Sequence, residues 1–128
     1  MVRAFCAIAT PVLHHVGIEV TPAETERTVE LFQLLGFKLV EPPQTLREFT
    51  WLEREGTQVH LMPTESPTVP SRGHTAVVVA DFERTFAALE EHGFEVERRR
   101  EHWGEPRALA FAPGGHRVEL MAAPPKPA

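Results

Sequence analysis

The chain has 128 residues, of which 42% are hydrophobic and 24% charged, and its formal net charge is -5. This composition excludes a disordered or fibrous protein and argues against nucleic acid as a partner, because proteins that bind nucleic acids present a basic face to the phosphates. Cys6 is the only cysteine, the opening MVRAFCAIATPV lacks the flanks of a signal peptide, and no apolar segment approaches the roughly 20 residues of a membrane span, so we expect a soluble cytoplasmic protein without a membrane partner.

The first half of the chain predicts a strand, a helix and three further strands. LHHVGIEV (13–20) alternates and is rich in β-branched residues, which is typical of a strand. A helix should follow, because Thr21 can cap it with Pro22 at the first position and Glu24 three residues after the cap, and Gly36 is a natural stop. The three strands are FKLVEP (37–42), FTWLER (49–54) and TQVHLM (57–62).

The second half predicts the same order of elements. Three prolines within residues 63–72 favour a stiff connector rather than a further element. HTAVVVA (74–80) is a strand, Asp81 is the N-cap of the next helix, and Gly93 ends that helix. The remaining strands are FEVERRR (94–100), RALAFA (107–112) and HRVELM (116–121).

The two halves are copies of one βαβββ module. An offset of 59 residues superposes His15 on His74 and GTQVHLM (56–62) on GHRVELM (115–121), with Glu119 standing where the first copy has His60. We therefore predict an α+β fold in a single domain, 1–128. Its parts are module one at about 12–62, the connector at 63–72, module two at about 73–122 and a tail at 123–128.

Four residues of metal-ligating type occupy matched places in the two modules. Side chains alternate between the faces of a strand, so His15, His60, His74 and Glu119 should lie on the face opposite the helices. Pairing the modules would then bring three imidazoles and a carboxylate together. Such a set suits one divalent ion, namely zinc, nickel, manganese or ferrous iron.

Further residues are candidates for substrate binding. Trp51 and Phe49 are expected to face the same side and either stack on a planar ligand or fill the core or a dimer interface. Gln58 and Arg117 share the ligand face by alternation, and His102 is a further candidate for the pocket.

Other histidines have structural explanations. His14 should point away from His15. His92 is expected near the C-terminus of a helix, where the helix dipole stabilises an imidazolium. His116 has the wrong alternation for the ligand face. Glu19 and Glu53 are secondary candidates for lining the concave face of the sheet that carries the candidate ligands.

The motifs HHVGIEV, LLGF, GTQVHLM, GHTAVVV, LEEHGFEV and APGGHRVELM, in that order over residues 12–122, resemble the vicinal oxygen chelate (VOC) superfamily, the glyoxalase / bleomycin resistance / extradiol dioxygenase group. The resemblance implies paired βαβββ modules that form a cupped, barrel-like mixed sheet with helices on its outer face. It also implies one bound metal and a homodimer, and its ligand positions fall on His15, His60, His74 and Glu119. A histidine at position 60 departs from the glutamate or glutamine of the best-known subgroups.

The resemblance implies a lyase or isomerase acting on a small substrate that chelates the metal through adjacent oxygens. Glu119 would be a ligand and a base, and His60 a ligand or a general acid/base. One alternative is an iron extradiol-type dioxygenase using His15, His74 and Glu119, against which the absence of tyrosine argues. Another is a drug-binding protein similar to bleomycin resistance proteins, against which the ligand-type residues argue.

Overall fold

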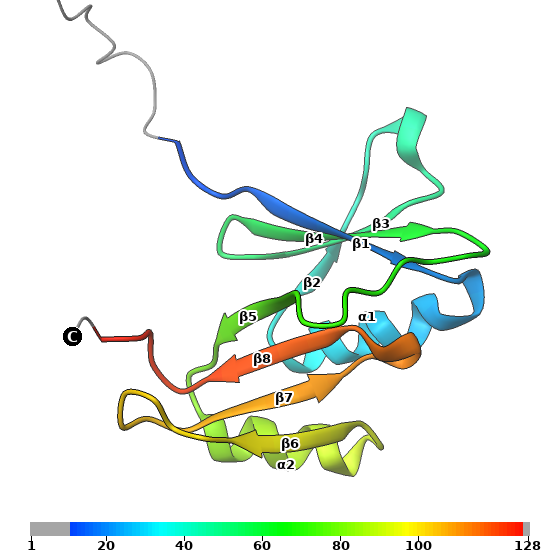
Figure 1. The fold of residues 1–128 in the computed structure, drawn as a ribbon. Coiled ribbons are helices and arrows are strands. Elements are labelled where there is room, and N and C mark those ends of the chain that lie inside the picture. Colours follow the sequence, from blue (N-terminus) through cyan, green and yellow to red (C-terminus); the bar gives the residue numbers. More distant parts are fainter. Residues whose placement is uncertain (1–10, 127–128) are drawn as a thin grey trace, which may run out of the picture.

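The computed structural model describes residues 11–126 and contains the βαβββ order twice (Figure 1). The prediction about Cys6 lies outside the described residues. The first half contains β1 (His15–Val20), α1 (Thr25–Leu34), β2 (Lys38–Val40), β3 (Thr50–Arg54) and β4 (Thr57–Pro63). The second half contains β5 (His74–Val78), α2 (Phe82–Glu91), β6 (Glu95–Arg99), β7 (Arg107–Phe111) and β8 (Arg117–Met121).

The strands form two four-stranded mixed sheets. Their orders are β1-β4-β3-β2 and β5-β8-β7-β6, so the first strand of each half lies at a sheet edge. The parallel pairs are β1 with β4 and β5 with β8, and the other neighbours are antiparallel. The predicted α+β architecture of two repeated units is confirmed, and the sheets are cupped without closing into a barrel (Figure 1).

The helices begin and end close to the predicted signals. The Asp81 carboxylate accepts a hydrogen bond of 3.1 Å from the Arg84 amide at the start of α2. The other helix begins four residues after its predicted cap, because Pro22–Glu24 forms a short 3-10 turn before α1. Gly36 and Gly93 have φ of 96° and 84°, the left-handed conformation that ends a helix.

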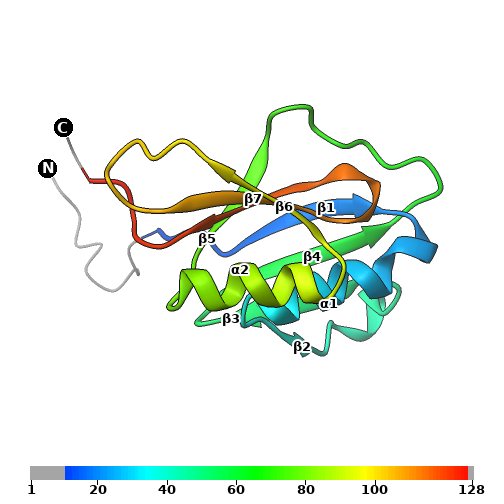
Figure 2. The same ribbon diagram turned by 90° about the horizontal axis from the view of Figure 1, so that it is seen from below.

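One apolar core joins the two halves. Each helix contacts its own sheet, and the two helices also pack against each other (Figure 2). The residues buried from α1 and α2, including Leu31, Phe32 and Leu89, belong to the same cluster as those of both sheets. The apolar faces of both sheets are therefore turned toward a common interior. Among the described residues, no helix is long and apolar enough to cross a bilayer.

Polar contacts add to this joint between the halves. The Arg27 guanidinium lies 3.8 Å from the centre of the Phe94 ring, and His92 Nδ1 lies 2.8 Å from the Glu30 carboxylate. The hydrogen bond from His92 is the main cause that lowers the pKa of Glu30, and the Arg27 hydrogen bond adds to it. The Arg54 guanidinium also donates to the Val78 carbonyl at 2.7 Å.

Two leucines that are cross-strand partners on β2 and β3 provide a test of the assigned core. Leu52 is fully buried, whereas its partner Leu39 is 53% exposed. Leu52→Ala should lower the free energy of unfolding by about 2–5 kcal/mol, because it leaves a cavity in the core. Leu39→Ala should cost about 0.5 kcal/mol or less. Urea denaturation of both variants measures this, and equal losses would contradict the assigned burial.

The Glu30–His92 contact predicts a pH dependence. Because the folded pKa of Glu30 is lowered, its stabilisation is present above the unfolded pKa of about 4.3 and is lost as the pH falls further. The urea midpoint of wild type should therefore exceed that of Glu30→Gln at pH 6, and the difference should shrink progressively as the pH falls below the unfolded pKa of Glu30. Glu48→Gln, an exposed carboxylate outside this contact, is the matched control, and an identical pH profile for it would refute the assignment.

Candidate metal centre

The first group of candidate ligands is a stack of rings on the face of the first sheet opposite α1, and for each sheet the face opposite its helix is called the outer face below. His60 on β4 lies opposite Trp51 on β3, and their rings are parallel with centres 3.9 Å apart. The imidazole of His15, at the start of β1, stacks on His60 with a centre distance of 3.9 Å and an angle of 17°. His60 is buried, whereas His15 is exposed at the open end of the stack. Trp51 therefore supports His60 with one ring face.

Two consecutive side-chain hydrogen bonds fix the orientation of His60. The Gln58 amide nitrogen donates to Glu53 Oε1 at 2.8 Å, which leaves the amide oxygen 2.7 Å from His60 Nε2. His60 consequently donates from Nε2 and keeps its lone pair on Nδ1. Burial lowers the pKa of His60, and the nearby charges of His15 and His14 lower it further.

The prediction for His14 is wrong. Its Nδ1 lies 3.0 Å from His15 Nδ1, and its ring centre is 6.3 Å from that of His60. The reason is that β1 begins at His15, so the alternation that applies within a strand does not extend to the residue before it. Three imidazoles therefore gather at this end of the first sheet.

The second group is an ion-pair network on the outer face of the second sheet. His74 Nε2 lies 3.0 Å from Glu119 Oε1, and His74 Nδ1 donates to the Arg72 carbonyl at 3.0 Å. Arg107 Nε donates to the other oxygen of Glu119 at 2.8 Å, and its NH1 group donates to the Arg100 carbonyl. Both oxygens of this buried carboxylate are thus held by named partners.

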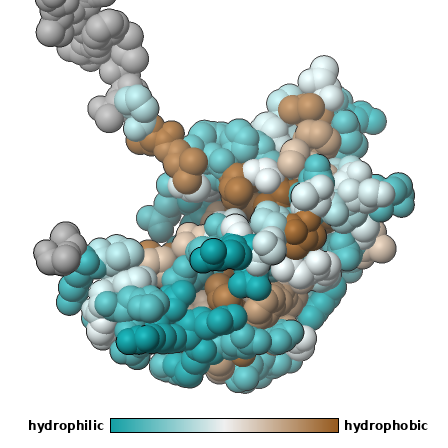
Figure 3. Space-filling model, viewed as in Figure 1, coloured by the Kyte–Doolittle hydropathy of each residue, from teal (hydrophilic) through white to brown (hydrophobic). Residues whose placement is uncertain are grey.

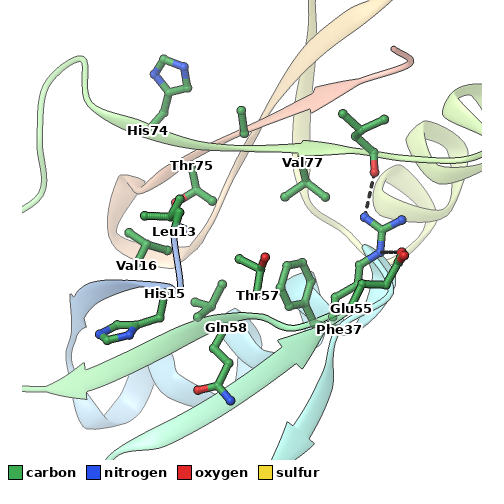
Figure 4. Close-up of a pocket in the computed structure, with 14 residues that line it drawn as sticks. Leu13, His15, Val16, Phe37, Glu55, Thr57, Gln58, His74, Thr75 and Val77 are labelled. Carbon is green, nitrogen blue, oxygen red and sulfur yellow. Dashed lines mark hydrogen bonds and ion pairs between the residues drawn. The ribbon is translucent and has the colours of Figure 1, made fainter. Parts of the chain in front are cut away.

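The two groups lie apart within one chain. A cavity of about 650 Å³ separates the edges of β1 and β5, and in Figure 4 the His15 and His74 imidazoles on its rim point away from each other. Across residues 11–126, no three histidine, cysteine, aspartate or glutamate side chains are grouped so that they could hold one ion. One chain therefore presents two pairs of ligand-type residues, His15 with His60 and His74 with Glu119.

The remaining candidates have separate positions. Arg117 and His102 line a second cavity, beside the His74–Glu119 pair. Phe49 precedes β3, is half-buried and makes no ring contact with the described aromatic residues. His116, the residue before β8, is buried, and its Nε2 donates to the carbonyl of Glu19 on β1 at 2.6 Å, so it links the two halves as a structural residue.

Sequence reasoning missed Arg107 and Arg72, which contact the second pair directly. Arg107 lies two residues before Leu109, the cross-strand partner of Glu119, so alternation along β7 places it on the same face. That signal needs the strand pairing, which the sequence does not supply. The contact to His74 comes from the backbone carbonyl of Arg72, and no residue type encodes such a contact.

The donor atoms of the second pair fit a divalent cation. Two adjacent ligand atoms that each lie about 2.1 Å from one ion are separated by about 3.0 Å in octahedral and about 3.4 Å in tetrahedral coordination, and His74 Nε2 and Glu119 Oε1 are 3.0 Å apart. A histidine that ligates a metal usually donates its other ring N–H to a carbonyl or carboxylate, as His74 does to Arg72. His60 is held by Gln58 in the same manner.

Solved structures share this fold at low sequence identity. A glyoxalase family protein from Bacillus anthracis has a TM-score of 0.77 and 20% identity, covering 88% of this chain and 95% of that one. The oxidase ChaP-H2 has a TM-score of 0.73 and 19% identity, with coverages of 91% and 97%. TnmS3, an antibiotic binding protein from Streptomyces sp. CB03234, has a TM-score of 0.70 and 18% identity, with coverages of 89% and 97%.

These similarities establish the fold. No curated protein matches the sequence at a significant level. The model of the Glyoxalase/Bleomycin resistance protein/Dioxygenase superfamily matches residues 12–124, which is nearly the whole chain and includes both pairs of ligand-type residues. The chain therefore belongs to the glyoxalase/bleomycin resistance protein/dioxygenase superfamily.

Proposed function

We propose that the protein is a metal-dependent enzyme of the glyoxalase type, a cytoplasmic lyase or isomerase whose small substrate presents two adjacent oxygens. One observation carries this proposal. His15 with His60 and His74 with Glu119 form two close pairs, each on the outward face of its sheet, and the partners of the second pair are 3.0 Å apart. Neutral imidazole and carboxylate are the ligand types that zinc, nickel, manganese and ferrous iron accept.

The complete site is proposed to form between two copies of the chain. Each copy would contribute one pair of ligands to a site, because the described residues of one chain do not group three ligand-type side chains and the His15 and His74 imidazoles point away from each other (Figure 4). The edge strands β1 and β5 have an unpaired side that a second copy can cover. Val12 and Leu13, beside β1, are 82% and 78% exposed, and an interface between copies would bury them.

The chemistry of the bound ion would be that of a Lewis acid, which holds the two substrate oxygens and takes up developing negative charge. Glu119 would ligate the ion through Oε1, which faces His74, because Arg107 anchors Oε2, and it would act as a base only when Oε1 leaves the ion. His60 presents the Nδ1 lone pair, because Gln58 occupies its Nε2–H, and this lone pair serves either as a ligand or as a general base. Trp51 keeps water from one face of the His60 ring.

This assignment differs from the interpretation of Trp51 as a stacking platform for substrate. Its indole is parallel to the His60 ring at an interplanar angle of 0°, so that face is already occupied. Trp51 Nε1 is buried without a hydrogen-bond partner among the described residues. We therefore assign Trp51 to the support of His60 and place the substrate at the exposed side of the His15 ring.

Metal analysis tests the proposal. Untagged protein, reloaded separately with zinc, nickel, manganese and ferrous iron, should retain about one ion per chain by elemental mass spectrometry. His15→Ala, His74→Ala and Glu119→Ala should each weaken binding by about tenfold or more, because each removes a ligand atom. His92→Ala is the control, since this exposed imidazole contacts Glu30 and not the proposed ligands.

The same experiment separates the alternatives. Retained iron together with oxygen consumption would replace the lyase or isomerase with a dioxygenase. Failure to retain any of the four ions after reloading would overturn the metal proposal and favour a protein that only binds a small molecule.

A further inference from the structure

One cavity on the face of the second sheet opposite α2 is lined by charges opposite in sign to that of the whole chain. The formal net charge is -5, yet a cavity of about 360 Å³ on this face is lined by five arginines and no carboxylate. Strongly hydrophilic side chains gather over β6, β7 and β8 in Figure 3. The arginines are Arg72, Arg99, Arg100, Arg107 and Arg117.

The arginines come together because of strand register. Arg99 on β6 and Arg107 on β7 are cross-strand partners, so their side chains leave the sheet on the same face. Arg117 lies two residues before Glu119 on β8 and therefore shares that face. Arg72 lies two residues before the start of β5 and supplies the carbonyl that holds His74. The cavity thus opens directly beside the His74–Glu119 pair.

Three of the five guanidinium groups have no partner among residues 11–126. Arg107 is engaged by Glu119, and Arg99 by Glu97 at 3.0 Å. The guanidinium groups of Arg72, Arg100 and Arg117 make no hydrogen bond or ion pair with the described residues. Like charges in one cavity repel each other, so an anion that enters it relieves this repulsion and also gains charge-assisted hydrogen bonds.

We propose that this cavity binds a small molecule carrying at least two anionic groups, and that this anion is the part of the substrate that lies beside the proposed metal. Anion binding does not depend on the proposed function, whereas the position of the anion beside the metal rests on it. Guanidinium groups recognise carboxylate and phosphate oxygens by paired hydrogen bonds, and three uncommitted groups exceed what one carboxylate neutralises. The volume is near the lower end for ligand pockets, which favours a short dicarboxylate or a phosphorylated compound.

Isothermal titration calorimetry of the full-length protein tests the proposal with malonate and inorganic pyrophosphate as the two probes. The protein is first dialysed against EDTA, so that binding cannot occur through a metal. At least one probe should bind with a Kd below about 1 mM at low salt, and the tighter probe identifies carboxylate or phosphate as the preferred group. Added sodium chloride should weaken the binding.

Variants assign the binding to this cavity. Arg117→Gln and Arg72→Gln should each weaken the tighter probe by about tenfold or more, because each removes charged hydrogen bonds. Arg84→Gln is the matched control, since this exposed arginine lies on α2 at the opposite face of the sheet. Circular dichroism checks that every variant is folded. Replacement by lysine should restore part of the affinity, because it returns the charge without the paired geometry.

Two results would overturn the inference: neither probe binds below about 1 mM, or binding is unchanged by both Arg117→Gln and Arg72→Gln while the variants are folded. Failure of the proposed function gives a different result. If the protein retains no metal but the anions bind with the expected dependence on these arginines, the cavity remains an anion site and only its link to the metal chemistry falls.

Discussion

The packing of α1 against α2 over one shared core decides where every other feature of this molecule lies. Both sheets turn their apolar faces toward that core, and the Arg27–Phe94 and Glu30–His92 contacts join the halves at the helices. The polar faces must then point outward. As a consequence, the repeat in the sequence produces two separate pairs of ligand-type residues among the described residues of a chain, which are the proposed half-sites.

The half-sites differ in character although the modules are copies. The first is a stack of rings, in which Trp51 supports His60 and His60 supports His15. The second is an ionic network in which a buried carboxylate is held by Arg107 and faces His74. The exchange of His60 for Glu119 at matched positions thus changes the surroundings as well as the ligand. An aromatic wall and a cavity lined by arginines suit the proposed substrate, which has a chelating end and an anionic end.

The sequence predicted the positions of the helices and strands better than it predicted the contacts between them. Helix signals at Asp81, Gly36 and Gly93 depend on local backbone chemistry, so they transfer directly to the structure. Strand alternation likewise placed His60 and Glu119 away from the core, because the period of a strand is a local property. His14 lies one residue before β1, and there strand alternation wrongly predicted that its side chain points away from His15.

The contacts of the candidate site depended on information that a single sequence does not carry. Arg107 reaches Glu119 because β7 pairs with β8 in one register, and the Arg72 carbonyl reaches His74 through the path of the connector. Whether the two ligand pairs converge depends on the direction in which the helices pack, and the repeat is compatible with either arrangement. Tertiary packing therefore determines the contacts of Arg107 and Arg72 and the separation of the two pairs, which periodicity and spacing do not predict.

Mixing two inactive variants tests the central claim, that one site takes a ligand pair from each of two chains. His15→Ala lacks a ligand of the first pair and Glu119→Ala lacks one of the second. If the pairs meet between chains, denaturing and refolding the two variants together gives mixed dimers with one intact site and one doubly damaged site, so tight metal binding returns to part of the protein. If tight binding does not return although mixed dimers are demonstrated, the site does not form between chains and the account is wrong.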